Sequence, residues 1–187
     1  VVRGREVVIT QDEQPLKAQV EKIPTLKPAF RPDGTVTAAN ACSISGGAAA
    51  LLLMRAPTAT GLGLRPLARV VGHAGHAQEP RLFTTAPVGA VRKLLKQVGW
   101  QTTDVDLWEI NEAFAVVAMA AMQELNLPHE QVNVQGGACA LGHPIGASGA
   151  RIMVTLVHAL QARGLKRGVA TLCIGGGEAT ALAVELL

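Results

Sequence analysis

The sequence contains few aromatic residues, and this shortage excludes some classes of binding protein. Its 187 residues include three Phe, two Trp and no Tyr. Modules that bind single-stranded nucleic acid stack the bases on exposed aromatic side chains, so no nucleic-acid partner is expected. Hydrophobic residues still make up 49% of the chain, which is enough to build a core from Ala, Val, Leu and Ile.

Cysteines and long apolar runs are scarce as well. Cys42, Cys139 and Cys173 are odd in number, and none of them forms a C-x-x-C pair. Neither a disulfide framework nor a metal site is therefore expected, and a reducing compartment is favoured, either the cytoplasm or an organelle matrix. The longest apolar run, residues 113–122, is too short to cross a bilayer, so no membrane partner is expected.

The sequence does contain a regular alternation of strand and helix patterns from about residue 67. Strands are predicted over residues 67–72, 105–110, 132–134, 169–174 and 179–186, and helices over residues 87–98 and 112–125 and from about residue 147. This order predicts an α/β fold with a mixed five-stranded sheet and helices on both faces.

The first 66 residues follow a different pattern. Residues 1–45 are rich in Pro and turn residues, which predicts loops that need a neighbouring surface. Residues 46–54 form a continuous apolar run that begins with two glycines, and this predicts a strand buried on both faces. The chain starts at Val1 without an initiator Met, so a piece of a longer protein is expected.

Three clusters of candidate functional residues follow predicted strands, where open α/β sheets bind their ligands. Asn111-Glu112-Ala113-Phe114, taken alone, is typical of a helix cap. Residues 136–149 surround His143 with glycines, which are needed where a backbone approaches another group closely.

The third cluster is residues 173–177, Cys-Ile-Gly-Gly-Gly. A single Cys at a strand end is more often a small buried residue than a reactive thiol. The glycines after it permit a tight turn whose N–H groups could form an oxyanion hole. Together, the Cys, the His, the Asn and this backbone are suited to acyl transfer through a thiol, although they do not identify the substrate.

These clusters closely resemble the motifs of the thiolase family, in the family's order. Residues 111–114 match N-E-A-F, residues 136–149 match G-G-x-x-A-L-G-H-P-x-G-A-S-G, and residues 173–177 match C-x-G-G-G. The resemblance covers essentially the whole chain and implies a thiolase-like fold. It implies that residues 1–45 end the loop domain that covers coenzyme A, that residues 46–66 end the N-terminal domain, and that residues 67–187 form the C-terminal domain.

The resemblance also implies catalytic roles. His143 is expected to take the proton of a nucleophilic cysteine that lies outside this chain. With a water held by Asn111, it is also expected to stabilise the enolate of the thioester. Cys173 is expected to be the acid/base at the α-carbon, with a depressed pKa. The N–H of Gly175 is expected to bind the oxyanion of the acyl-enzyme step.

Four further residues are implied to contact the substrate. Ala38 and Cys42 are expected near the pantetheine arm of coenzyme A, with Cys42 standing where the family often has Ser. Phe114 is expected to line the acyl pocket. Phe83 stands where many biosynthetic members have Met, which should reshape that pocket.

The activity implied by the resemblance is that of an acetyl-CoA C-acyltransferase of fatty acid metabolism. It interconverts 3-ketoacyl-CoA plus CoA with acetyl-CoA plus acyl-CoA, and its coenzyme A thioesters are substrates rather than cofactors. The expected partners are CoA and acyl-CoA, the N-terminal half of the same thiolase, and further copies in a homodimer or homotetramer. The chain alone is expected to be inactive. The alternatives are a non-catalytic thiolase-like binding or assembly module and a ketoacyl synthase, a family that prefers His at the position of Cys173.

Overall fold

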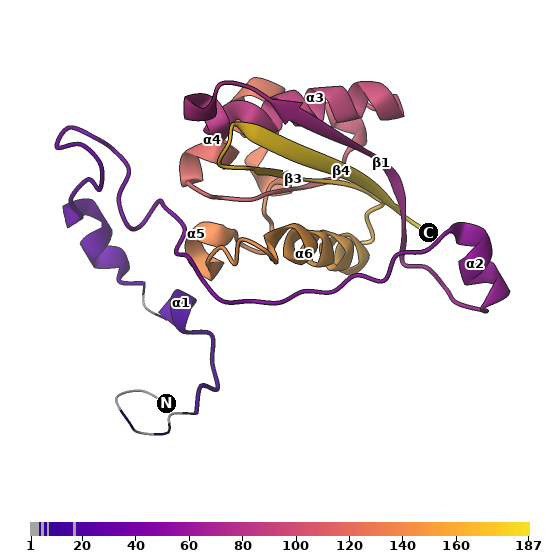
Figure 1. The fold of residues 1–187 in the computed structure, drawn as a ribbon, viewed down its shortest axis with the longest axis horizontal. Helices are drawn as coiled ribbons and strands as arrows, with labels where there is room; N and C mark the ends of the chain where they lie inside the picture. Colours follow the sequence, from indigo (N-terminus) through magenta and orange to yellow (C-terminus); the bar gives the residue numbers. More distant parts are fainter. Residues whose placement is uncertain (1–3, 5, 7, 17) are drawn as a thin grey trace.

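The computed structural model describes residues 4, 6, 8–16 and 18–187, and these form two unlike regions. Residues 8–66 run as an extended chain along one side of the molecule, whereas the residues after them pack into a layered α/β domain (Figure 1). The first region holds the short helices α1 (Glu13–Leu16), η1 (Val20–Thr25) and α2 (Ala56–Gly61). No helix in the described ranges is long and apolar enough to cross a membrane.

The packed domain is built on a four-stranded sheet of order β1-β4-β3-β2. Its strands are β1 (Ala68–Ala77), β2 (Leu107–Ile110), β3 (Arg167–Cys173) and β4 (Glu178–Leu186). The β2 and β3 strands run parallel, and the β1–β4 and β3–β4 pairs are antiparallel. The mixed sheet predicted from the sequence is thus confirmed, including the final hairpin.

Helices cover both faces of this sheet. The long helices are α3 (Ala86–Val98), α4 (Ala115–Leu125) and α6 (Ser148–Arg163), and the short ones are η2 (Pro80–Thr85), η3 (Thr102–Asp104), η4 (His129–Gln131) and α5 (Ala138–Leu141). The α3 and α4 helices lie on one face and α6 lies on the other (Figure 1). The α3 helix has Pro87 in its first turn and ends before Gly99, which has φ of 71°. A Pro at the start and a Gly after the end are the signals that predicted this helix.

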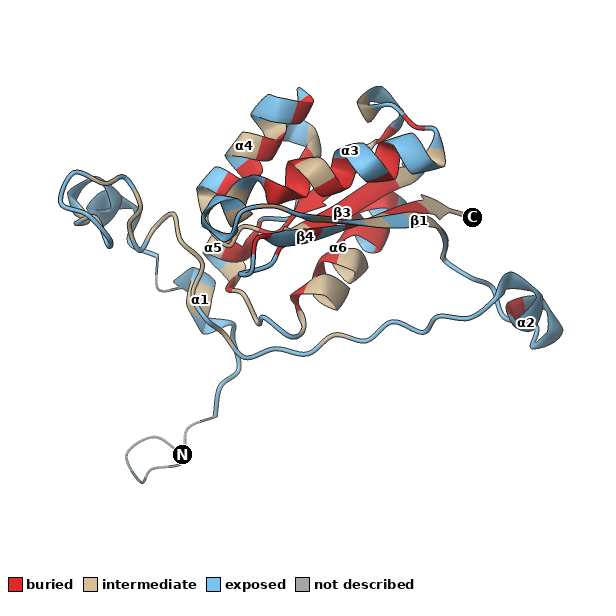
Figure 2. Cartoon of the chain, turned by 45° about the horizontal axis from the view of Figure 1, so that its top comes forward, coloured by how far each residue is buried: buried red, intermediate tan, exposed pale blue. Residues whose placement is uncertain are grey.

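Two apolar clusters hold the layers together, one on each face of the sheet. Trp108, Ile110 and Val169 face α3 and α4, whereas Leu107 and Ala170 face α6. This alternation follows from the period of two along a strand. Figure 2 shows the buried residues concentrated in the sheet and on the helix faces turned toward it, whereas the first region is almost entirely exposed.

The fifth strand predicted over residues 132–134 does not form. Only Val132 pairs, through a single bridge to Trp108, because Asn133 turns the chain away with a left-handed φ of 49°. The side chain of Asn133 then takes the place of a strand: Ile110 N donates to its Oδ1 at 2.8 Å, and its Nδ2 donates to Ile110 O at 2.9 Å. The sheet therefore has four strands rather than five.

The prediction of a buried strand over residues 46–54 is also wrong. The segment is extended but unpaired, and Leu52 and Leu53 are 85% and 70% exposed. An apolar run buries itself only where other elements offer a complementary surface. Residues 46–49 lie beside residues 144–147, whereas Leu52 and Leu53 stay exposed.

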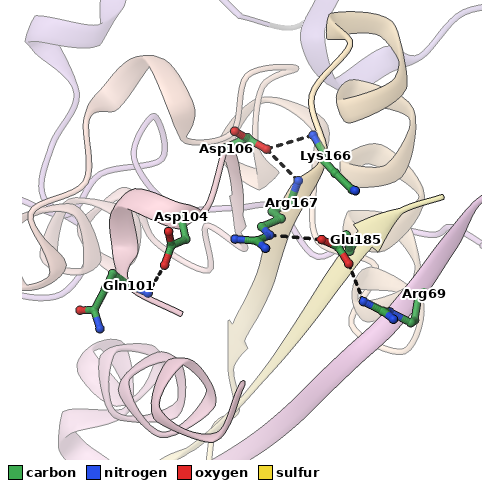
Figure 3. A network of polar contacts seen from close by, with 7 residues as sticks. All are labelled: Arg69, Gln101, Asp104, Asp106, Lys166, Arg167 and Glu185. Carbon is green, nitrogen blue, oxygen red and sulfur yellow. Dashed lines mark hydrogen bonds and ion pairs between the residues drawn. The ribbon is translucent and has the colours of Figure 1, made fainter. Parts of the chain in front are cut away.

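A polar network lies at the end of the sheet where the parallel strands β2 and β3 begin. Glu185 accepts from Arg69 at 2.6 Å and from Arg167 at 3.3 Å (Figure 3). The Asp106 carboxylate accepts from the backbone N–H groups of Lys166 and Arg167, and the Arg167 guanidinium lies 4.9 Å from the ring centroid of Trp100. These contacts fix the entry into β3, and thus the strand that ends at Cys173.

Candidate active site

Asn111 and Cys173 lie at the carboxyl ends of the two parallel strands. Asn111 directly follows β2, and its N–H donates to Thr171 O of β3 at 3.0 Å. Cys173 is the last residue of β3, two positions after Thr171. Both side chains are buried, with Asn111 1% and Cys173 7% exposed. The structure thus brings these two predicted site residues to the same end of the sheet.

His143 joins them from the glycine-rich segment before α6. Its Nε2 lies 3.4 Å from Asn111 Nδ2, and its Nδ1 lies 2.6 Å from Ser148 Oγ. The Ser148 hydroxyl lies 3.1 Å from the Pro144 carbonyl, to which it can donate while its oxygen accepts from Nδ1–H. In that tautomer, the Nε2 lone pair accepts from Asn111 Nδ2. Sequence reasoning missed Ser148, although it lies inside the glycine-rich motif.

The charge state of the imidazole also suits a base. Burial lowers the pKa of His143, and the nearby positive charge of Arg151 lowers it further. Arg151 lies on α6, and its Nε and Nη1 are buried without a hydrogen-bond partner among the described residues. A neutral imidazole whose Nε2 carries a lone pair can accept a proton at neutral pH once a thiol replaces Asn111 as its partner.

The expectation of a depressed pKa at Cys173 is wrong for this structure. Burial raises the pKa of the Cys173 thiol, and the nearby Cys42 thiol raises it further. Removing water from a thiolate disfavours the charged form. Cys173 is therefore a protonated thiol at neutral pH and is suited to donate a proton.

Glu112 has a role that its interpretation as a helix-capping residue does not reveal. The α4 helix begins only at Ala115, and Glu112 reaches sideways to the glycine-rich segment instead. Its carboxylate accepts from Asn133 Nδ2 at 2.8 Å and from Cys139 N at 3.0 Å. A side chain at Gly137 would collide with this carboxylate, since its Cβ would come within 2.3 Å of all three carboxyl atoms. Glu112 thus holds the segment that leads to His143.

Burial raises the pKa of Glu109, the buried acid of β2, to about 7, although the charge of Arg151 opposes this shift. The signal available in the sequence was an acidic residue between Trp108 and Ile110, inside a predicted strand. No group of three or more His, Cys, Asp or Glu in the described part of the chain is arranged to hold a metal ion.

Backbone hydrogen bonds tie the first region to the site at residues 40–44. Ala115 N donates to Asn40 O at 2.8 Å, Cys42 N donates to Ala113 O at 3.2 Å, and His143 N donates to Ser43 O at 2.9 Å. Cys42 is half-buried beside the site, whereas Ala38 lies in an exposed turn at its edge. Cys42 thus lies beside the site, whereas no hydrogen bond in the described structure joins Ala38 to it.

All three phenylalanines of the chain meet beside the site. Phe114 makes edge-on contacts with Phe30 and Phe83, with ring centroids 6.1 Å and 6.2 Å apart. Phe83 and Phe114 are half-buried, and Phe30 is 74% exposed. Phe83 and Phe114 were predicted as site residues, but their direct contact was not. Gly175 is exposed in the turn between β3 and β4.

Comparisons with known proteins point to one protein family. The sequence profile described as the thiolase C-terminal domain matches residues 64–186, and that of the thiolase N-terminal domain matches residues 1–57. The chain belongs to the thiolase family. A probable acetyl-CoA acetyltransferase of Dictyostelium discoideum is 53% identical over 184 residues, which are 98% of this chain and 44% of that protein.

Solved thiolase structures share the fold. The crystal structure of Bacillus anthracis acetyl-CoA acetyltransferase has a TM-score of 0.93 at 49% identity, covering 99% of this chain and 47% of that one. Acat5 thiolase from Ascaris suum in complex with coenzyme A has a TM-score of 0.84 at 45% identity, covering 96% of this chain and 47% of that one. The chain thus spans about half the length of these thiolases.

Proposed function

We propose that this chain supplies the acid/base half of a thiolase active site, which catalyses thiolysis of 3-ketoacyl-CoA and the reverse Claisen condensation. The observation that carries the proposal is the placement of His143, whose Nε2 lies 3.4 Å from the buried Asn111 amide while Ser148 holds Nδ1 at 2.6 Å. Asn111 Oδ1 is buried without a partner among the described residues, and a water or a substrate donor would satisfy it.

In the thiolysis direction, His143 Nε2 takes the proton of a cysteine thiol supplied by the other half of the enzyme. The thiolate attacks the 3-keto carbon, and the C2–C3 bond then breaks to leave an acyl-enzyme and the enolate of acetyl-CoA. The Cys173 thiol gives its proton to the α-carbon of that enolate. The resulting thiolate takes the proton of an incoming CoA thiol, which attacks the acyl group and releases acyl-CoA, and the expelled cysteine thiolate takes back its proton from His143.

The raised pKa of Cys173 supports this order of steps. A buried thiol begins the cycle protonated, which is the form that the enolate needs. In the proposed site, the Gly175 N–H lies at the tip of the turn and binds the oxyanion of the acyl-enzyme step. Ala38 and Cys42 contact the pantetheine arm, while Phe83 and Phe114 line the acyl pocket.

The exposed apolar segment of residues 46–54 supports the second part of the proposal, that an N-terminal thiolase half packs here. Leu51, Leu52, Leu53 and Met54 are all exposed in the isolated chain. An apolar row of this kind marks an interaction surface. Assembly of complete subunits into a homodimer or homotetramer is part of the same proposal.

The experiment that tests the function compares the 187-residue chain with a fusion that restores a complete subunit. The first half of Bacillus anthracis acetyl-CoA acetyltransferase, placed ahead of the chain, supplies a nucleophile on a matching fold. Thiolysis of acetoacetyl-CoA is expected from the fusion and not from the chain alone. His143→Ala and Cys173→Ala in the fusion are expected to lower kcat by roughly 10²–10⁴.

The matched control is His158→Ala, because His158 lies exposed on α6. Rapid cleavage of acetoacetyl-CoA by the 187-residue chain alone would contradict the proposal that the nucleophile comes from the other half. A fusion whose turnover survives both site substitutions would instead favour the non-catalytic binding or assembly module.

A further inference from the structure

Gln78 lies between two parts of the site that are far apart in the sequence. It follows β1 directly, and its side-chain Nε2 donates to Leu82 O at 2.5 Å and to Thr85 Oγ1 at 2.8 Å. Both acceptors belong to η2, the short helix that carries Phe83. The Thr85 hydroxyl also donates to Leu82 O at 3.0 Å, so the three groups form a closed set of hydrogen bonds.

The orientation of the Gln78 amide is determined by these partners. Leu82 O can only accept, so the amide nitrogen must face η2 and the amide oxygen must face His76. His76 Nε2 lies 3.1 Å from Gln78 Oε1 and is the donor in that pair. The His76 ring is held flat against α3, where a Cβ on Gly89 would lie 2.4 Å from it. Gln78 is thus fixed from both sides.

The backbone of Gln78 meets the glycine turn after Cys173. Gln78 N donates to Gly177 O at 3.0 Å. Gly177 has φ of 94°, and a Cβ at this position would lie 2.3 Å from Gln78 O. Only glycine permits this close approach. One residue therefore ties the Gly175–Gly177 turn to the helix that presents Phe83.

The contact between Phe83 and Phe114 carries this link to the polar site. Phe114 is three residues from Asn111, and its backbone is bridged to Ala41. Gln78 holds the backbone of η2 at Leu82, next to Phe83, and so sets where the Phe83 ring meets Phe114. Phe83 and Phe114 both pack against the apolar cluster that includes Cys173.

We propose that Gln78 is a specificity-determining positioning residue, which holds Phe83 against Phe114 and so restricts the site to short acyl groups. The inference rests on the proposed thiolase function. It adds the substrate class: the two-carbon acetyl group is accepted in preference to longer acyl groups, which the aromatic pair disfavours. Loosening Gln78 should admit longer chains and leave the polar groups of the site unchanged.

The first test uses the 187-residue chain. Its three Phe residues and the absence of Tyr leave the aromatic NMR region nearly free of overlap. A nuclear Overhauser contact between the rings of Phe83 and Phe114 is expected in the parent and in the control Gln161→Ala, which alters an exposed glutamine on α6. The contact should be lost in Gln78→Ala. An unchanged contact in a folded Gln78→Ala protein overturns the positioning role.

Thr85→Val provides a second variant that leaves Gln78 in place. It removes one acceptor at an exposed position, so folding is expected to survive, and the ring contact should weaken. If Gln78→Ala fails to fold, an undiminished contact in Thr85→Val overturns the proposal.

The second test measures selectivity in the fusion described above. The ratio of kcat/KM for acetoacetyl-CoA over 3-ketohexanoyl-CoA should fall about tenfold in Gln78→Ala, the size expected when a pocket gains room for extra methylene groups. Phe83→Ala should shift the ratio in the same direction, and the double variant should add little, because both changes act on the same aromatic pair. A fusion without thiolysis refutes the proposed function, whereas an active fusion with an unchanged ratio refutes this inference alone.

Discussion

The two regions of this chain have similarly apolar segments but bury them very differently. In residues 8–66 only Ala59 is a buried hydrophobic residue, although Leu51, Leu52 and Leu53 are all present there. In residues 67–187 the sheet and its helices remove whole layers of Leu, Val and Trp side chains from water. The difference teaches that apolar composition permits burial, but that neighbouring elements decide it.

The same comparison explains which part of the first region is ordered by contacts. Residues 40–44 make backbone hydrogen bonds to Ala113, Ala115 and His143, so this short stretch is tied to the packed domain. The segments on either side of it lack such ties in the described structure, and most of their residues are exposed. Residues 40–44 are therefore the part of the first region that backbone hydrogen bonds hold at the site.

The largest expected effect comes from a truncation inside the packed region. Leu156 on α6 is fully buried, with its side chain against Gly168 of β3. Leu156→Ala should lower the free energy of unfolding by about 2–5 kcal/mol, because it leaves a cavity. Leu52→Ala, the matched change in the first region, should alter it by less than about 0.5 kcal/mol. Urea denaturation of both variants measures the two changes in the free energy of unfolding. Equal decreases would contradict the difference in burial between the two regions.

The next effect concerns the buried acid of β2. Burial raises the pKa of Glu109 from 4.5 to about 7, so the stability linked to its protonated form is present below pH 4.5 and is lost as the pH rises through about 7. Between about pH 5 and pH 8 this loss amounts to about 2–3 kcal/mol. Glu109→Gln should abolish that part of the pH dependence of unfolding.

The control for Glu109 comes from the first region. Glu21 is exposed in η1, so Glu21→Gln should leave the pH profile of the parent unchanged. Denaturant unfolding at several pH values provides the measurement. A Glu109→Gln profile as steep as that of the parent would show that the buried acid is ionised throughout.

The smallest expected effect tests the link between the regions. Asn40 closes its own turn, accepting from Thr37 N at 2.7 Å and donating to Thr35 O at 2.9 Å. Asn40→Ala removes both hydrogen bonds, but it should change global stability by less than about 1 kcal/mol, because local opening does not expose the core. Amide exchange at Cys42 and Ala115 should accelerate about tenfold, with the amides of α6 as the internal reference. Unchanged exchange at both residues would mean that the turn does not hold the docked segment.

Sequence reasoning predicted the parts of the fold that local signals specify. Pro87 and Gly99 mark the ends of α3, and the alternation of strands and helices predicts the mixed sheet. It failed where a side chain replaced backbone pairing, as at Asn133, because the sequence does not reveal a left-handed φ. It also failed for residues 46–54, since an apolar run does not itself supply the surface that would bury it.

The motifs predicted the convergence of Asn111 and His143, and the structure confirms it. The sequence could not reveal the residues that hold them, because these act through contacts between distant segments. Ser148 holds Nδ1 of His143, Glu112 reaches across to Cys139, and Gln78 joins β1 to η2. Each is an ordinary polar residue whose partner lies in another element, so spacing along the chain carries little information about it.

The placement of the two tryptophans has a spectroscopic consequence. Trp100 and Trp108 are 9% and 1% exposed, both lie in the packed domain, and the chain has no Tyr. Ultraviolet-excited emission from this protein therefore arises from the neighbourhood of β2 and the end of α3. The signal will shift when the layered domain melts and will be nearly silent to any rearrangement of the first 66 residues, whose motions need a dye or an isotope label to be seen.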